Sequence, residues 1–506
     1  MSLMVYTKGA WHKRAAAPRG MGLNTTPIAL TGPTLRIVQI VCVFLICLKL
    51  AQLSFAGVFM DEAYYWMWGQ HPALSYYDHP PLNAWMLGLS SSVFGWNLFA
   101  LRLPIGLAFF TDILALFLIS RRIGGAPWQS HFWITLLLFL VTPIYWMITN
   151  YGLPDHTLLT CCLFAIHFFY CFFQDRSENR PGATRDLTLG ALFLGLAVLS
   201  KYNGAFLGIG IALFVLFRDR ALLRQPRMYL AAALALAIQI PVVVWNASER
   251  FASFGFIVGG RHSGLNASFD GLYPLAIGIL IFISPILFWP IAKFVFSRAQ
   301  VAGFGFARVT FLVSTVAIVA ISFTTATLFH WNLVAYAAML PFLALYIRPR
   351  WLLALQSVCG AALAAALFVN YSIVQITPAQ WRDEATAWSY GWAPTAEAVR
   401  LARAEHEVGF VAGADYTTAS LLGFELHDKE VASLSPRQEQ YDFWFDQAAH
   451  AGQDAILFGD DFRPLSAGIA AQFESVTEII ALDVIQGDRR IDTHHLYLAK
   501  GFKPNG

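Results

Sequence analysis

Long apolar runs recur along the first three quarters of the chain and constrain its fold more than any other feature. A helix needs roughly 20 apolar residues to cross the hydrocarbon core of a bilayer. Candidate spans lie near residues 35–58, 98–119, 131–149, 157–173, 187–200, 203–217, 229–246, 272–292, 309–328, 332–347 and 351–371. Only 13% of the residues are charged, about half the share of a soluble domain. The sequence therefore predicts a polytopic α-helical membrane protein with about 11–13 transmembrane helices.

The distribution of Lys and Arg predicts the orientation of these spans, because cytoplasmic segments carry the excess of positive charge. Residues 1–34 are polar and mildly basic and show no cleavable signal peptide of the usual form, so we expect a cytoplasmic N-terminal tail. With that tail inside, the outer loops before residue 372 hold only Lys201, Arg250 and Arg261. The inner segments hold Lys8, Lys13, Arg14, Arg19, Arg121, Arg122, Arg176, Arg180, Arg185, Arg218, Arg220, Arg224, Arg227, Lys293, Arg298, Arg308, Arg348 and Arg350.

Residues 372–506 have the composition of a soluble domain and, with an odd number of spans, lie outside. "EVGFVAG" and "DAILFGDD" read as buried strands, and "THHLYLAKGF" as a closing strand. "TTASLLGFEL" and "PLSAGIAAQF" read as amphipathic helices. We expect a small α/β domain on the outer side of a 35–371 transmembrane domain, with acceptor recognition as its natural role.

The outer loop 59–97, directly after the first span, concentrates acids among aromatic rings. Its core, "MDEAYYWMWGQHPALSYYDHPPLNAW", contains Asp61, Glu62, Asp78 and His79 but no Lys or Arg. A carboxylate without a basic partner near a low-dielectric region is costly, and such groups tend to be functional. The alternative is structural: an interfacial aromatic belt, a helix N-cap at Asp61 and a turn at Asp78.

Chemistry at an outward cavity explains this loop better. A carboxylate there can accept a proton from a hydroxyl nucleophile, and aromatic faces such as that of Tyr65 suit the C–H faces of sugars. The two prolines of "DHPP" restrict the backbone, which would hold Asp78 and His79 in place.

Other polar residues fall at the outer ends of the remaining spans. Asp155 starts the fourth span, where it could also cap the helix. Lys201 and Tyr202 divide an apolar run over 187–217 into halves too short to cross upright, so Lys201 should lie recessed; it could bind a lipid phosphate or reach to the headgroups. Three further candidates are the basic pair of "GGRHSG" and the histidine of "FHWNLVAY", with a solvated loop and an interfacial position as alternatives: Arg261, His262 and His330.

The loop motif carries a family resemblance. "DEAYYWMW" followed by "YYDHPPLNAW" resembles the first outer loop of bacterial GT-C glycosyltransferases of families 39 and 83. These are the relatives of protein O-mannosyltransferases, lipid A aminoarabinose transferases and lipopolysaccharide-core galacturonosyltransferases. "NYGLPDHTLL", "AVLSKYNGAFL", "FHWNLVAY" and the stretch "DYTTASLLGFELHDKEV" are similar to the same family.

The resemblance implies a GT-C fold, a polyprenyl-phosphate sugar as donor, inversion at the anomeric carbon, and Asp61 as catalytic carboxylate. Asp155 would assist Asp61 or orient the acceptor. Donor or acceptor binding falls to the outer polar residues already named: Glu62, Tyr65, Asp78, His79, Lys201, Tyr202, Arg261, His262 and His330. His79 stands where the aminoarabinose transferases have Lys, which leaves its phosphate-binding role open.

The predicted function is transfer of a sugar to a hydroxyl of a lipopolysaccharide or other glycolipid at the outer face of a bacterial inner membrane. A protein acceptor is the alternative within the class. A flippase or transporter would place polar residues near mid-membrane in repeated halves, and a sensor would leave the acidic loop without a purpose. We expect no cofactor and no metal site, although a divalent cation could serve some related enzymes, and no nucleic-acid partner; membrane lipid surrounds the chain.

Overall fold

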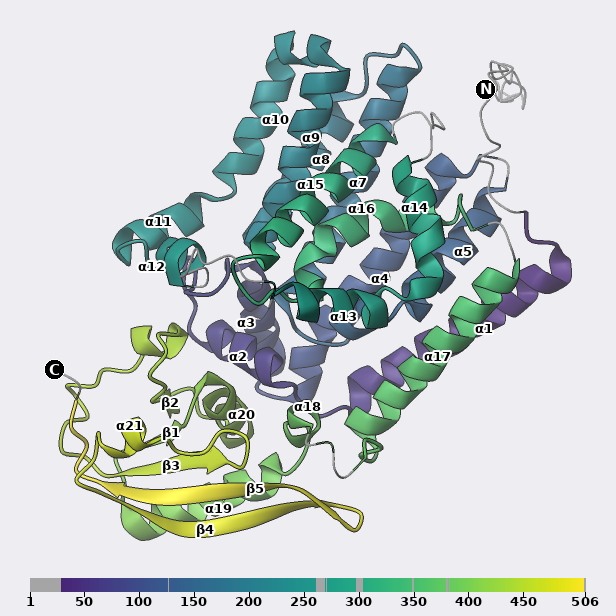
Figure 1. Cartoon of the computed structure of the whole chain (residues 1–506). Coiled ribbons are helices and arrows are strands. Elements are labelled where there is room, and N and C mark those ends of the chain that lie inside the picture. The colour runs from purple at the N-terminus through teal and green to yellow at the C-terminus, as the bar shows by residue number, and fades with distance from the viewer. Residues whose placement is uncertain are drawn as a thin grey trace, which may run out of the picture.

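The computed structural model describes residues 29–125, 127–260, 269, 271–296, 304–347, 350–378, 381 and 383–504. The chain forms a bundle of helices and, below it in Figure 1, a smaller domain built on a sheet. The bundle is made of α1 (Gly32–Phe55), α4 (Leu98–Ile123), α5 (Trp128–Val141), α6 (Pro143–Ile148), α7 (Pro154–Ser177), α8 (Thr184–Ser200), η1 (Tyr202–Gly204), α9 (Ala205–Arg218), η2 (Arg220–Arg224), α10 (Pro226–Ala237), α11 (Ile240–Ser248), α12 (Ala252–Gly255), η3 (Phe256–Gly260), α13 (Leu272–Phe282), η4 (Pro285–Leu287), α14 (Phe288–Phe296), α15 (Gly305–Ser322), η5 (Phe329–Asn332), α16 (Leu333–Leu343) and α17 (Arg350–Ser372).

Each of the eleven predicted spans coincides with helix, and the polytopic helical architecture is confirmed. Among the described residues, five straight helices are long and apolar enough to cross a membrane: α1, α4, α7, α15 and α17. Three other apolar segments, those of α5, α9 and α16, are shorter. α5 and α16 are buried by neighbouring helices, so they do not have to match the bilayer thickness by themselves, whereas α9 leaves Leu216 and Phe217 exposed.

Two predicted spans are bent instead of straight. The helices α10 and α11 meet at 44°, and α13 meets the η4–α14 segment at 83°. Pro285 follows Ser284, whose φ of 75° lies in the left-handed region that no helix continues through. The predicted span over 272–292 is therefore broken into two helices, and Phe282 ends α13 beside the cavity described below.

Burial within the bundle follows the distribution of apolar residues. Every residue of α16 is buried, and so is most of α5 and α7, as expected of helices that are apolar all round. Large apolar side chains of the peripheral helices stay exposed, including Phe44 of α1, Leu230 of α10 and Val358 of α17. Exposed apolar side chains in this number suit contact with lipid.

The basic segments that were predicted to share one side of the membrane meet in space. Arg122 lies 2.7 Å from Asp175, Arg176 lies 2.6 Å from Asp219, and the guanidinium of Arg227 donates to the carbonyl of Gly182. These contacts join the loops at one end of the bundle. The sheet domain lies at the other end (Figure 1).

The predicted outer loop forms two helices between the bundle and the sheet domain. They are α2 (Met60–Gln70) and α3 (Leu82–Phe94). α2 packs on α3 and on the sheet domain, and α3 packs on α4, α7 and α8. Gly69 and Gly88 sit at the α2–α3 crossing, where a Cβ on either would lie within 2.7 Å of the other backbone. The loop is therefore an ordered layer of the structure.

The C-terminal domain holds a five-stranded mixed sheet with strand order β2-β1-β3-β5-β4. β1 pairs in parallel with β2 and β3, while β3–β5 and β4–β5 are antiparallel. Its elements are α18 (Glu384–Ala387), α19 (Trp392–His406), β1 (Phe410–Gly413), α20 (Tyr416–Leu426), β2 (Ala432–Ser433), η6 (Gln440–Phe443), β3 (Ala455–Asp460), α21 (Ala467–Ala470), β4 (Ser475–Gln486) and β5 (Arg489–Lys500). α20 packs on β1 and β3 and also on α2. It thus connects the sheet to the helical layer.

Sequence reasoning found β1, β3, β5 and α20 but not the rest of this domain. The expected helix over 464–473 is wrong except for the single turn α21. Gly468 weakens this helix, and the chain turns at Phe473 to enter the long strand β4, which was not predicted.

Candidate active site

A cavity of about 520 Å³ lies where the bundle, the α2–α3 layer and the C-terminal domain meet. One part of its wall is apolar and comes from bundle helices, with Trp146, Phe282, Leu328 and Leu367 among its residues. The other part is polar and includes seven of the predicted site residues: Asp61, Tyr65, Asp78, His79, Asp155, Lys201 and His330. Residues separated by as many as 269 positions along the chain, Asp61 and His330, thus share one amphipathic site.

Asp61 reaches the cavity from the first turn of α2. Phe59 occupies the N-cap position, so Asp61 is not the N-cap that the structural alternative required. Carboxylates in the first turn are favoured by the helix dipole. The neighbouring Glu62 points away from the cavity, and these adjacent acids therefore have different environments.

Glu62 is fully buried and does not line the cavity. Its carboxylate accepts the Gly152 N–H at 2.8 Å and lies 2.8 Å from the guanidinium of Arg102. Arg102 also donates to the carbonyls of Gly57 and Asn150. The predicted substrate contact of Glu62 is therefore corrected: the side chain joins the start of α2 to α4 and to the segment before α7.

Asp155 and Lys201 form a buried ion pair in the cavity wall. Asp155 is in the first turn of α7, Lys201 follows the last residue of α8, and the ammonium lies 2.7 and 2.9 Å from the two carboxylate oxygens. Both residues are at least 95% buried. Lys201 is thus buried in the cavity wall, and the anion that it pairs with is a protein carboxylate.

Asp78 is held by both the α2 layer and the C-terminal domain. It accepts a hydrogen bond from the Tyr64 hydroxyl at 2.7 Å and pairs with Arg437 at 3.1 Å. Tyr64 in turn accepts the Gln440 N–H at 3.0 Å, and the Gln440 side chain accepts the Tyr77 N–H at 2.7 Å. Burial, reinforced by the Asp78 charge, raises the pKa of Tyr64, which keeps its hydroxyl a hydrogen-bond donor. The "DHPP" turn is therefore fixed by contacts as well as by its prolines.

Arg437 is a cavity residue that the sequence did not single out. Its guanidinium lies 5.5 Å from the ring centre of Phe256 and 5.6 Å from that of Tyr416, and Tyr416 also lines the cavity. Aromatic faces attract a cation at such distances. One arginine among many in a soluble domain gives no local signal; only the fold brings it to Asp78.

Three ionisable residues inside the spans were also missed. Asp112 and His156 are buried 3.0 Å apart, and the Lys49 ammonium donates to the carbonyl of Trp146 at 3.1 Å. Ionisable groups within spans are rare and mark internal polar networks. A charge inside an apolar run is the signal that would have found Lys49 and Asp112, whereas His156 directly follows Asp155 in the first turn of α7.

The remaining predicted residues lie elsewhere. Tyr202 is not in the cavity wall, and its hydroxyl shares a hydrogen bond with Ser253 at 2.8 Å. Arg261 and His262 lie outside the described residues. In the described part of the chain, no group of three or more His, Cys, Asp or Glu is arranged to hold a metal ion.

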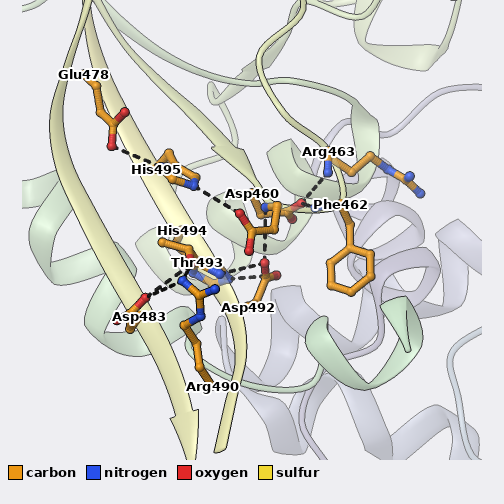
Figure 2. A network of polar contacts seen from close by, with 11 residues as sticks. Asp460, Phe462, Arg463, Glu478, Asp483, Arg490, Asp492, Thr493, His494 and His495 are labelled. Atoms are coloured by element: carbon orange, nitrogen blue, oxygen red, sulfur yellow. Dashed lines mark hydrogen bonds and ion pairs between the residues drawn. The ribbon is translucent and has the colours of Figure 1, made fainter. Parts of the chain in front are cut away.

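A second polar cluster occupies the sheet domain away from the cavity. Figure 2 shows Asp460 of β3, Asp492 and His495 of β5, and Glu478 beside His495. The other ring nitrogen of His495 lies 3.5 Å from Asp461. Burial raises the pKa of Asp460 to about 6 and that of Asp492 to about 7. None of these residues lines the cavity; Asp461 and Asp492 instead line a separate pocket of the C-terminal domain.

The chain is similar to a protein family, to a relative found by sequence and to a solved structure described below. The family described as dolichyl-phosphate-mannose-protein mannosyltransferase matches residues 78–245. The lipid A galacturonosyltransferase RgtD of Rhizobium johnstonii is 29% identical over 192 residues, which are 37% of this chain and 38% of that protein. The match thus spans well under half of that relative's length.

The crystal structure of ArnT from Cupriavidus metallidurans in the apo state superposes with a TM-score of 0.59 and 15% identity, covering 92% of this chain and 98% of that one. The same protein bound to undecaprenyl phosphate gives the same TM-score, with 14% identity over 91% of this chain and 98% of that one. The architecture, including the C-terminal domain, is therefore GT-C.

Proposed function

We propose that this chain of the GT-C glycosyltransferase fold moves a sugar from a polyprenyl-phosphate donor to a hydroxyl group of a lipopolysaccharide or other glycolipid acceptor. The reaction takes place at the outer face of a bacterial inner membrane, with the C-terminal domain in the periplasm. One observation carries the proposal: a single cavity combines an apolar wall within the bundle with carboxylates, cations and aromatic rings at its end. A lipid-linked sugar has the same division between an apolar chain and a polar head.

Two kinds of relative support the donor class. ArnT has been solved with undecaprenyl phosphate, and the matching family is described as using dolichyl-phosphate-mannose. The RgtD match adds a lipid A acceptor to the related activities. These names describe relatives, and the proposal extends their shared chemistry to this chain.

The proposed reaction is a single displacement. Asp61 takes the proton from the acceptor hydroxyl, the acceptor oxygen forms a bond to the anomeric carbon, and the bond from that carbon to the phosphate oxygen breaks. Polyprenyl phosphate leaves with the bonding electrons. Attack from the face opposite the phosphate inverts the anomeric configuration.

The cations of the cavity would stabilise the leaving phosphate. The Lys201 ammonium has three donors, so it can contact phosphate while Asp155 holds it in position. His330 and His79 line the same cavity and can donate further hydrogen bonds. Fixed donors aimed at developing charge are usually the largest catalytic contribution. Asp78 and Tyr65 are assigned to sugar positioning.

The test compares the wild type with Asp61→Asn, using purified protein and a panel of polyprenyl-phosphate sugars and membrane glycolipids. Mass spectrometry detects a glycolipid that gains one sugar. We expect transfer by the wild type and a loss of about a hundredfold or more in Asp61→Asn, because the base is removed. Asp488→Asn, an exposed aspartate in the β4–β5 turn, is the matched control and should retain full activity. Undiminished transfer by a folded Asp61→Asn variant would exclude Asp61 as the base.

Protein O-glycosylation is the second candidate, because the matching family is described as protein mannosyltransferases. The same assay with a peptide or protein acceptor separates the two. Sugar gained by protein and not by glycolipid would favour this candidate.

A further inference from the structure

A second cleft, of about 550 Å³, lies in the C-terminal domain next to the catalytic cavity. It is formed by the segment 434–438, by Asp442 and Gln447, and by the turn over 468–472. Arg437 lines both the cleft and the cavity. The two spaces are therefore neighbours that share one side chain as part of their wall.

The shared wall is held in a defined position. The Arg437 guanidinium pairs with Asp78 and lies against the rings of Phe256 and Tyr416. Its backbone N–H donates to the Ser435 hydroxyl at 3.1 Å, which fixes the turn that carries it. Because these contacts already restrain the Arg437 side chain, it loses little conformational freedom when a ligand contacts its remaining donors.

The cleft presents hydrogen-bond donors and acceptors together. The amides of Gln438, Gln447 and Gln472 offer both, and Asp442 offers acceptors, beside the donors of Arg437. A phosphate or carboxylate ligand needs donors and would be repelled by Asp442. Each hydroxyl of a saccharide is both donor and acceptor, so a polyhydroxyl ligand matches this set of groups.

We propose that this cleft is the subsite for the saccharide part of the acceptor, which it holds so that one hydroxyl passes Arg437 and enters the catalytic cavity. The inference rests on the proposed glycosyltransferase function and names the acceptor as a glycan-bearing molecule recognised outside the membrane. The tail of a lipid-linked acceptor stays in the bilayer while its sugar residues occupy the C-terminal domain.

The experiment uses the full chain in lipid nanodiscs and two cleft variants. Gln438→Ala/Gln472→Ala removes two amides, and Gln472→Trp fills the cleft. Gln486→Ala, in the β4–β5 hairpin of the same domain, is the matched control. Two probes are used: intact lipopolysaccharide as acceptor, and its deacylated core oligosaccharide as a ligand whose binding is followed by saturation-transfer NMR.

We expect the acceptor KM of both cleft variants to rise by about three- to tenfold per hydrogen bond lost. The donor KM and the kcat, which reports the chemical step in which Asp61 acts, should not change. Binding of the core oligosaccharide should weaken by the same factor and remain at the wild-type level in Gln486→Ala. Binding of the deacylated probe identifies the saccharide as the recognised part. If the wild type uses intact lipopolysaccharide but does not bind the deacylated oligosaccharide, the cleft does not recognise saccharide and the inference is overturned.

The outcomes separate this inference from the proposed function. Unchanged acceptor KM and oligosaccharide binding in both cleft variants would overturn the cleft assignment while transfer by the wild type still stands. An absence of wild-type transfer, with oligosaccharide binding lost in the variants, would remove the enzyme proposal and keep the cleft. A rise in KM for a peptide acceptor, without any effect on oligosaccharide binding, would show a protein-binding cleft and overturn the saccharide class.

Discussion

Two of the acids that face the cavity are held by cations from distant parts of the chain. Asp155 has Lys201, 46 positions away, and Asp78 has Arg437, 359 positions away. Each pair removes most of the charge that a lone carboxylate would place in a low-dielectric site. The pairs also fix where the cations can meet a substrate. The charges of this site are therefore coupled to its stability.

Replacing Lys201 by Met tests that coupling. The change leaves Asp155 buried without its partner, and removing one member of a buried pair costs about 3–5 kcal/mol. We expect a lower unfolding temperature, measured by tryptophan fluorescence in detergent, together with a loss of transfer. Asp155→Asn/Lys201→Met should regain most of the stability, because no charge is stranded, but not the activity. A stable and active Lys201→Met chain would contradict both roles.

The sequence predicted the acids of this site better than their partners. Asp61, Asp78 and Asp155 stand out because they interrupt apolar or aromatic segments at span ends. Glu62 stands out equally, yet its partner is Arg102 and its role is structural. Local sequence shows that a charge is unusual, whereas its partner depends on which helices pack together. Arg437 could not be predicted for the same reason.

At the scale of elements, the segment 437–443 connects the C-terminal domain to α2. It carries Arg437 and Gln440 toward the "DHPP" turn, and Phe443 packs near Tyr77 and Trp245. Glu439 lies in the middle of this segment and is 99% buried. Asp415, Asp442 and Asp78 add negative charge around it, and burial is the main cause that raises its pKa to about 8.

The raised pKa of Glu439 predicts a loss of stability with rising pH. Between about pH 4.3, where an unfolded Glu titrates, and pH 8, the folded chain keeps a proton that the unfolded chain has released. The free energy of unfolding therefore falls across this window. Glu439→Gln keeps the shape without the charge, so it should match the wild type near pH 4, below the pKa of the unfolded chain, and be more stable at pH 8. Unfolding temperatures measured across this range give the comparison.

Glu405→Gln, on the exposed face of α19, is the matched control and should follow the wild type at every pH. The raised pKa values of Asp460 and Asp492 contribute a similar decline, but equally in all three chains. A Glu439→Gln chain that loses stability at pH 8 would show that the carboxylate is stabilised by contacts and is not simply buried.

Elements were predictable where apolar runs were long and unbroken. The spans were located from hydropathy alone, since a buried helix needs no other signal. The 83° bend after Phe282 was missed because a proline within an apolar run is tolerated in many membrane helices. β4 was missed because its apolar residues do not alternate cleanly: one face is only partly covered, as the mixed burial along the strand shows.

At the scale of the whole molecule, the cavity exists only when all three layers are present. The bundle gives its apolar wall, α2 gives Asp61, and the C-terminal domain gives Tyr416 and Arg437. The contact between layers is close: a Cβ on Gly57, after α1, would lie 2.6 Å from the carbonyl oxygen of Ser389. Composition separates the soluble domain from the spans, but hydropathy carries no information on how the two dock.

The final prediction concerns the orientation of the molecule in the membrane. Ala451 is exposed in the C-terminal domain, and Ala183 is exposed just before α8. The cavity residue Lys201 follows the other end of α8, whose 17 residues span about 25 Å. Ala183 and the C-terminal domain that carries Ala451 therefore lie toward opposite ends of this helix. The basic segments 121–122, 176–185 and 218–227 gather at the Ala183 end, and positive charge favours the cytoplasm.

We therefore introduce Ala451→Cys and Ala183→Cys separately into a chain whose six native cysteines are replaced, and treat spheroplasts with a membrane-impermeant maleimide. Ala451→Cys should be labelled at once, and Ala183→Cys only after the membrane is permeabilised, because its side chain lies in the cytoplasm. The cysteine-free parent measures background labelling. The reverse pattern would place the cavity on the cytoplasmic side, where the proposed lipid-linked donor would have to be used before it crosses the membrane. Labelling of both sites in sealed cells would mean that the chain inserts in two orientations. Such dual insertion requires a weak charge bias between the two ends of the bundle. The excess of Lys and Arg at the Ala183 end makes the bias strong, so we expect a single orientation.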